Sequence, residues 1–447
     1  MTAKRATLLS LGVLFAINIL NFYDRNVAGA LARPIAQDFQ LNDAQIGLLG
    51  SAFIWIYALI GVPFGRIADR YSRKRLLAFG MAIWSALTAF GGVAMNYAML
   101  MISRIGVGVG EAVVAPSGTS WIGDLVPAGR RARTLAVFML GVPLGGALSY
   151  FCSGPISQAF GWRVGMMAAA APALLLIPLL LVLREPKRGA AEAVHAAPTG
   201  SVWQVLRIPT LWWIIASGAL VNFNMYAYGT FLPSFFYRIH FLSDSRSNIM
   251  TGIAYAIGGV AGGVLGGVWG DRIIHARKDG RMLSAAVIAL LGAPLGYFGI
   301  IQGNGSLLLA VALITLAYGT LNSYYGLVYS SIQDIVAPAF RGTAMSVYFM
   351  FMYLGGASFG PLLTGSLSDH MALRAAREAG KQLTRGQHDP FRAVGLQQAM
   401  IVIPILSAAL ALVLYLGSRT IARDMARREA GEGQVIPAVA AAGTPAS

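Results

Sequence analysis

The chain alternates between long apolar stretches and short polar ones. An α-helix rises about 1.5 Å per residue, so about twenty apolar residues suffice to cross the ~30 Å hydrocarbon core of a bilayer. Twelve stretches reach that length with few charges, and we expect each to form a membrane-spanning helix. Their expected ranges are 7–28, 43–64, 76–95, 98–122, 134–153, 164–184, 210–237, 247–269, 283–302, 306–330, 342–367 and 393–417.

The second half of the chain repeats features of the first. The run 131–138, followed by Gly145-Gly146-Ala147, has a parallel in the run 341–348, followed by Gly355-Gly356-Ala357. Such a parallel duplication predicts an all-α membrane protein of two pseudo-symmetric six-helix bundles. The expected parts are an N-terminal bundle at 1–185, a cytoplasmic linker at 186–208, a C-terminal bundle at 209–420 and a disordered cytoplasmic tail at 421–447. Residues 371–381 are expected to form either a short amphipathic outer helix or a solvated loop.

Composition supports the membrane assignment, since 56% of the residues are hydrophobic and only 12% are charged. The net charge of +16 is concentrated in alternate loops and near both ends. Cytoplasmic loops carry the excess of Lys and Arg, so we expect a multi-pass protein of a bacterial inner membrane with both termini in the cytoplasm. The cations then reflect topology and attraction to membrane lipids, and no nucleic-acid partner is expected. Cys152 is the single cysteine, which excludes a disulfide within the chain.

A short basic motif follows the second expected span and recurs after the eighth. The first copy is Gly65-Arg-Ile-Ala-Asp69-Arg70, followed by Arg73, and the second is Gly267-Val-Trp-Gly-Asp271-Arg272. This pattern resembles the G-x-x-x-D-R loop signature of the major facilitator superfamily, with Ser72 in place of the usual Gly and Ile67 in place of the usual Leu. The alternative is an ordinary basic loop. The resemblance implies a substrate site between the two bundles, and conformational gate motifs at Gly65, Asp69, Arg70, Arg73, Arg131, Gly267, Asp271, Arg272 and Arg341.

Four ionisable residues lie inside expected spans, where charge is costly and therefore points to function. Asp24 and Arg25 fall in the first span, and Arg104 and Glu111 share one face of the fourth. Gly106, Gly108 and Gly110 are expected to leave an open polar stripe between Arg104 and Glu111, and Asp24 to reach Arg104. A carboxylate that meets an arginine in only one conformation could couple proton movement to transport. The alternative is a static buried ion pair, and Arg104 could also bind an anionic group.

The C-terminal half offers neutral polar residues instead of charges. Tyr and Asn beside Phe and Met would suit a partly apolar ligand, although many could simply hydrogen-bond between helices. The cavity-lining candidates are Asn222, Asn224, Tyr226, Tyr318, Asn322 and Tyr348, with Tyr228, Tyr324, Tyr325 and Tyr353 as further members of the set.

Two short motifs narrow the resemblance. Tyr23-Asp24-Arg25, together with Arg104-x-x-x-Gly108-x-Gly110-Glu111-Ala112 and Pro116, resembles the spinster branch of the superfamily, which moves lysophospholipids and sphingolipids. The resemblance implies an amphipathic lipid substrate, with its headgroup near Arg104 or Arg25 and proton coupling through Asp24 and Glu111. It also implies a monomer that needs no metal or cofactor other than protons.

Three other functions compete with lipid transport. The run Gly141-x-Pro143-x-Gly145-Gly146 loosely resembles the antiporter signature of multidrug or small-metabolite exporters of the same fold. An intramembrane lipid-modifying enzyme is disfavoured, because no Ser/His/Asp set is evident and the five histidines lie near loops or span ends. A transporter-like sensor would need a signalling domain, which we do not expect here.

Overall fold

The computed structural model describes residues 3–187, 202–336, 340–383 and 390–430, and these are helical without any strand. The expected all-α membrane fold is confirmed. We call 3–187 the first half and 202–430 the second half. The helices of the first half are α1 (Ala3–Ala30), α2 (Ala32–Asp38), α3 (Asp43–Arg70), α4 (Arg73–Gly92), α5 (Tyr97–Glu111), α6 (Val114–Leu125), α7 (Ala128–Met139), α8 (Gly141–Phe160), α9 (Trp162–Ala170) and α10 (Pro172–Val182).

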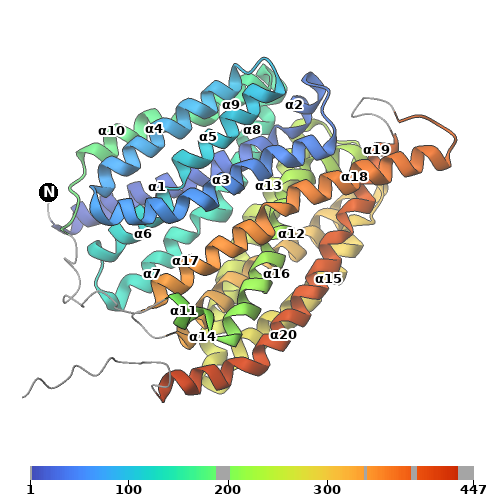
Figure 1. Cartoon of the computed structure of the whole chain (residues 1–447). Coiled ribbons are helices and arrows are strands. Elements are labelled where there is room, and N and C mark those ends of the chain that lie inside the picture. Colours follow the sequence, from blue (N-terminus) through green and yellow to red (C-terminus); the bar gives the residue numbers. More distant parts are fainter. Residues whose placement is uncertain (1–2, 188–201, 337–339, 384–389, 431–447) are drawn as a thin grey trace, which may run out of the picture.

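The second half follows the same plan after a short helix, α11 (Val202–Leu206). Figure 1 shows its green-to-red helices beside the blue-to-cyan helices of the first half. The elements are α12 (Pro209–His240), α13 (Asp244–Ile253), the π-helical η1 (Ala254–Gly259), α14 (Val260–Ala276), α15 (Gly280–Ile300), the short η2 (Asn304–Ser306), α16 (Leu307–Ile335), α17 (Arg341–Met352), the π-helical η4 (Tyr353–Ala357), α18 (Phe359–Glu378), α19 (Pro390–Met400) and α20 (Val402–Glu429).

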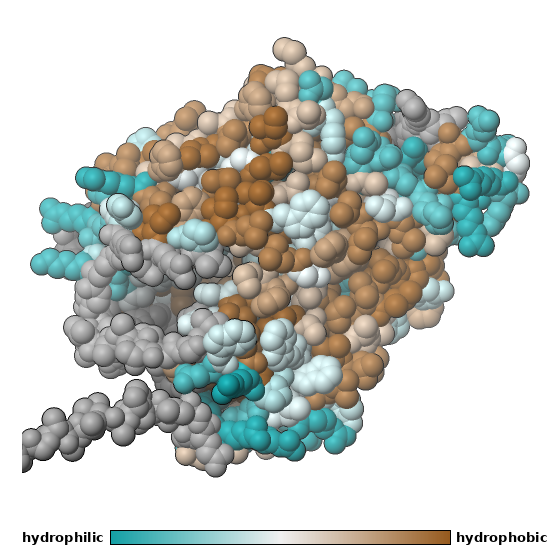
Figure 2. All heavy atoms as spheres, viewed as in Figure 1, coloured by the Kyte–Doolittle hydropathy of each residue, from teal (hydrophilic) through white to brown (hydrophobic). Residues whose placement is uncertain are grey.

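Eleven helical segments within the described residues are long and apolar enough to cross a membrane. The remaining expected span, 210–237, corresponds to α12, whose 32 residues are also long enough to cross. Its apolar content is lowered by the asparagines and tyrosines singled out above. Figure 2 shows apolar surface over the middle of the visible face and hydrophilic residues toward its ends, as expected for a protein embedded in lipid.

Several expected single spans are divided into two helices. The breaks that end α5, α7, α9 and α19 each lie within about one turn before a proline: Pro116, Pro143, Pro172 and Pro404. A proline has no N–H to donate to the carbonyl four residues earlier, and its ring crowds that carbonyl. The hydropathy pattern continues through these positions, so it does not reveal the interruptions.

The segment 371–381, expected to be either a short amphipathic outer helix or a solvated loop, is helical over most of its length, but as the last part of α18. Helix α18 continues without interruption to Glu378. It ends just before Gly380, whose φ of 68° is a left-handed conformation that favours glycine and commonly terminates helices. The helix therefore extends beyond the expected apolar span.

The two ends of the helices differ in chemistry. We call the end where α3 begins the Asp43 end, and the end where α3 meets α4 the basic end. At the basic end Arg73 pairs with Asp124 and, at 3.0 Å, with Glu185. Arg281 makes the corresponding pair with Asp334 in the second half. These clusters join helices within each half and reproduce the sequence duplication in three dimensions.

Glu185 lies just after α10 and therefore outside the membrane-spanning segments. Partial burial opposes its ionisation, but hydrogen bonds from the Ser72 hydroxyl at 2.6 Å and from the Arg73 backbone N–H at 2.9 Å outweigh that effect. Together with the guanidinium of Arg73, they hold the pKa of Glu185 below its ordinary value. Glu185, the residue just before the expected linker, is thus tied to the start of α4. His195 and residues 188–201 lie outside the described residues, as do residues 431–447 of the expected tail. Residues 421–429, which were expected to be disordered, instead continue helix α20.

Candidate functional site

The four charged residues predicted in the first and fourth spans lie together between α1 and α5. Arg104 Nη1 lies 3.2 Å from Asp24 Oδ1, as the sequence predicted. Arg25 Nε lies 2.9 Å from Glu111 Oε2, a pair that sequence interpretation did not assign. All four side chains are at most 3% exposed. Two ion pairs are therefore buried side by side within the first half.

The expected open stripe on α5 is wrong. A Cβ at Gly110 would lie 2.8 Å from the Trp84 backbone nitrogen, and a Cβ at Gly108 would lie 2.7 Å from the Phe53 carbonyl oxygen. A Cβ at Gly106 would meet the side chain of Leu87 at 2.6 Å. The three glycines allow α5 to pack closely against α3 and α4. The polar groups between Arg104 and Glu111 come from α1 instead.

Asp24 has a second partner that the sequence did not reveal. Thr88 on α4 donates its hydroxyl to Asp24 Oδ2 at 2.6 Å, and the Thr88 side chain is fully buried. Asp24 thus accepts hydrogen bonds from Arg104 on one oxygen and from Thr88 on the other. A threonine inside an apolar run gives little signal in sequence, because Thr also occurs as an ordinary packing residue that bonds to its own helix backbone.

Arg25 lies at the boundary between the two halves. Its guanidinium carbon is 4.0 Å from the ring centre of Tyr57 and 4.6 Å from that of Phe22, both cation–π distances. Tyr226 of α12 and Tyr353 of η4 are also close enough to interact with the Arg25 charge. Tyr353 packs edge-on against Tyr57 with ring centres 5.3 Å apart. The Arg25–Glu111 pair is therefore enclosed by aromatic side chains from both halves.

Most polar candidates of the second half make hydrogen bonds within that half. Asn224 Nδ2 donates to Ser407 at 3.0 Å, and Asn322 Nδ2 donates to the Tyr318 carbonyl at 3.0 Å. Tyr325 donates to Asn222 at 3.0 Å. Tyr324 and Tyr348 share a hydrogen bond of 3.2 Å, and Tyr228 packs edge-on against Tyr318. Of this set, Tyr226 and Tyr353 are the two that interact with the Arg25 charge.

A second contact between the halves involves tyrosines that sequence interpretation missed. Tyr150 of α8 donates its hydroxyl to the carbonyl of Gly229 on α12 at 2.6 Å. Its ring lies 5.0 Å from that of Tyr255, which stacks on Tyr318 at 4.4 Å. Tyr318 was among the expected cavity-lining candidates, but the chain contains 17 tyrosines, so their number alone did not distinguish Tyr150 and Tyr255.

The proposed gate motifs are described only in part. Gly267 has open space around its Cα, and the Arg272 side chain is exposed. Asp271 is largely exposed and lies 3.4 Å from Arg281. Arg341 is partly buried at the start of α17. The structure does not describe the surroundings of Gly65 or the side chains of Asp69, Arg70 and Arg131.

The arrangement supplies two buried carboxylates, each with an arginine partner, beside an aromatic boundary between the halves. Within the described part of the chain, no three His, Cys, Asp or Glu side chains are grouped as metal ligands. Arg25 Nη1 and Glu111 Oε1 are buried and have no hydrogen-bond partner. One unpaired donor and one unpaired acceptor therefore remain beside the pair, and buried polar atoms of this kind usually have partners.

Comparisons with known proteins place these features in a family. The sequence model of the Major Facilitator Superfamily matches residues 14–374. An "MFS-type efflux pump" of Mycolicibacterium smegmatis is 30% identical and covers 81% of this chain and 84% of its own. "Protein spinster homolog 1" of Homo sapiens is 27% identical and covers 81% of this chain and 73% of its own.

Solved structures agree with the sequence comparison. A bacterial homolog of the human lysosomal transporter Spinster, in an inward-facing and occupied conformation, has a TM-score of 0.80 at 27% identity, covering 95% of this chain and 99% of its own. The inward-facing, unoccupied conformation gives a TM-score of 0.78 at 28% identity, covering 94% and 98%. A D-xylose–proton symporter shares the fold, with a TM-score of 0.68 at 17% identity over 90% of this chain and 97% of its own.

Proposed function

The chain belongs to the major facilitator superfamily as a transporter of its spinster branch, and we propose that it carries an amphipathic lipid across the membrane by proton-coupled alternating access. The substrate class would be a lysophospholipid or a sphingolipid-like molecule. Membership of this family establishes a transporter in the membrane. The lipid substrate and the proton as coupling ion are what we propose.

The unpaired atoms beside the Arg25–Glu111 pair carry the substrate proposal. Arg25 Nη1 can donate to an anionic oxygen, and Glu111 Oε1 can accept from an ammonium or hydroxyl group. Tyr57, Tyr226 and Tyr353 provide aromatic surface around this position from both halves. A headgroup that carries both a phosphate and a donor group, attached to an apolar chain, matches this combination. Arg104 Nε is also buried without a hydrogen-bond partner, but Arg104 is less suited because its guanidinium pairs with Asp24 and lies over Phe53, both in the first half.

The two carboxylates support proton coupling. Each is fully buried and depends on one arginine partner, so separation from that partner would favour the neutral form. The Arg25 charge also interacts with Tyr226 and Tyr353 of the second half, whose position relative to α1 changes when the halves rock. We infer that this movement alters the Arg25–Glu111 pair and thereby links Glu111 protonation to the transport cycle. Asp24 would act in the same cycle through Arg104.

The charge distribution supports a membrane orientation. Arg73, Arg281 and the cations that close α20 lie at the basic end. We propose that this end and both termini face the cytoplasm, in the inner membrane of a bacterium. The Asp43 end then faces outward. A monomer is sufficient for this mechanism, because both halves of the site belong to one chain.

A second candidate function is export of drugs or small metabolites with the same fold. The 30% identity to an MFS-type efflux pump favours it. Such an exporter would use the same carboxylates for coupling but would not require a phosphate-bearing substrate. Protection of growing cells against cationic dyes would distinguish this function from lipid transport.

Uptake by proteoliposomes tests the proposal. The purified chain would be reconstituted, and uptake of labelled lysophosphatidylcholine and sphingosine phosphate measured with and without a pH gradient. Parallel samples would carry Asp24→Asn, Glu111→Gln and Arg104→Ala, with Glu378→Gln as a surface carboxylate control. Gradient-stimulated uptake that is lost in both buried-carboxylate variants while lipid binding persists supports the proposal. A parent protein that transports neither lipid would refute the substrate class, and full gradient dependence in both variants would refute the coupling role.

A further inference from the structure

A buried ion pair joins the two halves at the Asp43 end. Asp43 begins α3 in the first half, and Arg238 lies in the last turn of α12 in the second half. Arg238 Nη1 and Nη2 donate to the two carboxylate oxygens of Asp43, each at 2.7 Å. Both side chains are 1% exposed. This two-pronged geometry is the strong form of an arginine–carboxylate contact.

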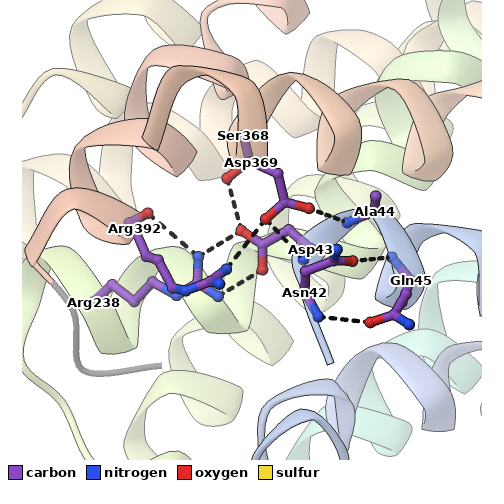
Figure 3. A network of polar contacts seen from close by, with 8 residues as sticks. All are labelled: Asn42, Asp43, Ala44, Gln45, Arg238, Ser368, Asp369 and Arg392. Atoms are coloured by element: carbon purple, nitrogen blue, oxygen red, sulfur yellow. Dashed lines mark hydrogen bonds and ion pairs between the residues drawn. The ribbon is translucent and has the colours of Figure 1, made fainter. Parts of the chain in front are cut away.

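Other polar groups complete the contact, as Figure 3 shows. Ser368 of α18 donates its hydroxyl to Asp43 Oδ2 at 2.7 Å. The Asp369 carboxylate accepts the backbone N–H groups of Asp43 at 3.2 Å and Ala44 at 2.8 Å. Asp369 of the second half therefore accepts hydrogen bonds from N–H groups that have no partner within their own helix, at the start of α3 in the first half. Arg392 donates to Asp369 Oδ1 at 3.1 Å, so two carboxylates are balanced by two guanidiniums.

The backbones of α3 and α18 also touch at this end. A Cβ at Gly47 would lie 2.2 Å from the Pro361 carbonyl oxygen, and a Cβ at Gly365 would lie 2.2 Å from the Asp43 carbonyl oxygen. Glycine is required at both positions for this approach. The ionic contact is thus placed beside a close helix–helix contact.

The opposite end lacks a comparable link in the described part of the chain. Among the described residues, the ion pairs between the halves are Asp43–Arg238 and the nearby Arg33–Asp244, and both lie at the Asp43 end. At the basic end, Arg73 and Arg281 pair with acidic residues of their own halves. Among the side chains that the structure describes, the ion pairs that join the halves therefore lie at the Asp43 end.

We propose that Asp43, Arg238, Ser368 and Asp369 form a latch that holds the Asp43 end closed, and that breaking this latch is required to open the site toward that end. When the halves separate there, both charges of the Asp43–Arg238 pair become hydrated. In the closed state, removal of one partner leaves the other charge buried and uncompensated, which is strongly destabilising. Loss of either partner should therefore shift the protein toward the conformation that is open at the Asp43 end.

Distance measurements between spin labels test the latch without any substrate, so they are independent of the proposed function. Labels would be attached to Met95→Cys and Asn304→Cys, exposed positions of the two halves at this end, in a Cys152→Ser background. The ratio of long to short distances should rise at least about tenfold in Asp43→Asn and in Arg238→Gln. The double variant Asp43→Arg with Arg238→Asp should return toward the parent ratio. Arg374→Gln, which removes an exposed pair within α18, is the matched control.

Each result of the distance measurements either supports or overturns the latch. Monodisperse Asp43→Asn and Arg238→Gln proteins that keep the parent distance distribution would overturn the latch, as would an equal shift in Arg374→Gln. Should the charge variants not yield monodisperse protein, Ser368→Ala decides the matter, because it removes a single hydrogen bond. A smaller shift in the same direction supports the latch, and an unchanged distribution in Ser368→Ala overturns it.

Discussion

Arg25 Nε lies 2.9 Å from Glu111 Oε2, although Asp24, the acidic neighbour of Arg25 in sequence, pairs with Arg104 instead. Adjacent residues on a helix point about 100° apart, so one dipeptide of α1 supplies two separate ion pairs to α5. Because the aromatic boundary between the halves surrounds only the Arg25 pair, the two pairs are expected to have different roles.

Substitution of Arg25 by lysine should weaken lipid binding. Lysine keeps the charge but loses the planar fork that can bond to Glu111 and to a phosphate together. We expect the dissociation constant for lysophosphatidylcholine to increase at least about tenfold, which corresponds to a loss of ~1.4 kcal/mol in binding free energy. The measurement is equilibrium binding to the purified protein in detergent. Arg419→Lys on the exposed part of α20 should bind as the parent does, and parent-like binding by Arg25→Lys would remove Arg25 from the substrate site.

Thr88 should act on transport through Asp24. Thr88→Val keeps the shape of the side chain but removes the 2.6 Å hydrogen bond to Asp24 Oδ2. A hydroxyl that donates to a carboxylate favours its charged form, so we expect the pH profile of proton-driven uptake to move to higher pH. Thr88→Ser should restore the parent profile. An equal loss of uptake at every pH, with the same profile in both variants, would indicate a purely structural role.

Gly110 should tolerate no side chain. Gly110→Ala places a methyl group 2.8 Å from the Trp84 backbone nitrogen, and helices α4 and α5 must separate to accommodate it. We expect a destabilisation of about 1–3 kcal/mol, the usual cost of overpacking a tight interior. The loss of stability would be measured by thermal unfolding, with the folded fraction of each heated sample determined by size-exclusion chromatography. Gly12→Ala is the matched control, because a Cβ there meets nothing within 4 Å; a comparable loss in both variants would contradict the packing argument.

Glu185 should contribute stability that disappears in acid. Its pKa lies below the ordinary value in the folded protein, so its contribution is present above the unfolded pKa of about 4.3 and is lost as the pH falls through the folded pKa. Glu185→Gln should therefore unfold at a lower temperature than the parent at pH 7, by about 1–2 kcal/mol in stability. That difference should vanish at strongly acidic pH. Glu378→Gln, at an exposed pair, should match the parent throughout, and a difference that persists in acid would contradict the ionic explanation.

The sequence by itself determined the features that depend on local composition. Apolar runs of sufficient length predicted the spans, because crossing a bilayer requires about twenty apolar residues in any helical protein. The cost of burying charge singled out Asp24, Arg25, Arg104 and Glu111. The recurring Gly and Asp-Arg motif indicated the family. Each inference needed only the identity and spacing of nearby residues.

Only the tertiary structure decided which side chains meet. The rotation and relative shift of neighbouring helices placed Arg25 against Glu111 and turned the glycines of α5 toward α3 and α4. The latch was missed because Asp43 lies at the edge of an expected span and Arg238 just beyond one, where flanking charges are ordinary. Helices distant in the chain had to come together before these two charges became one buried pair.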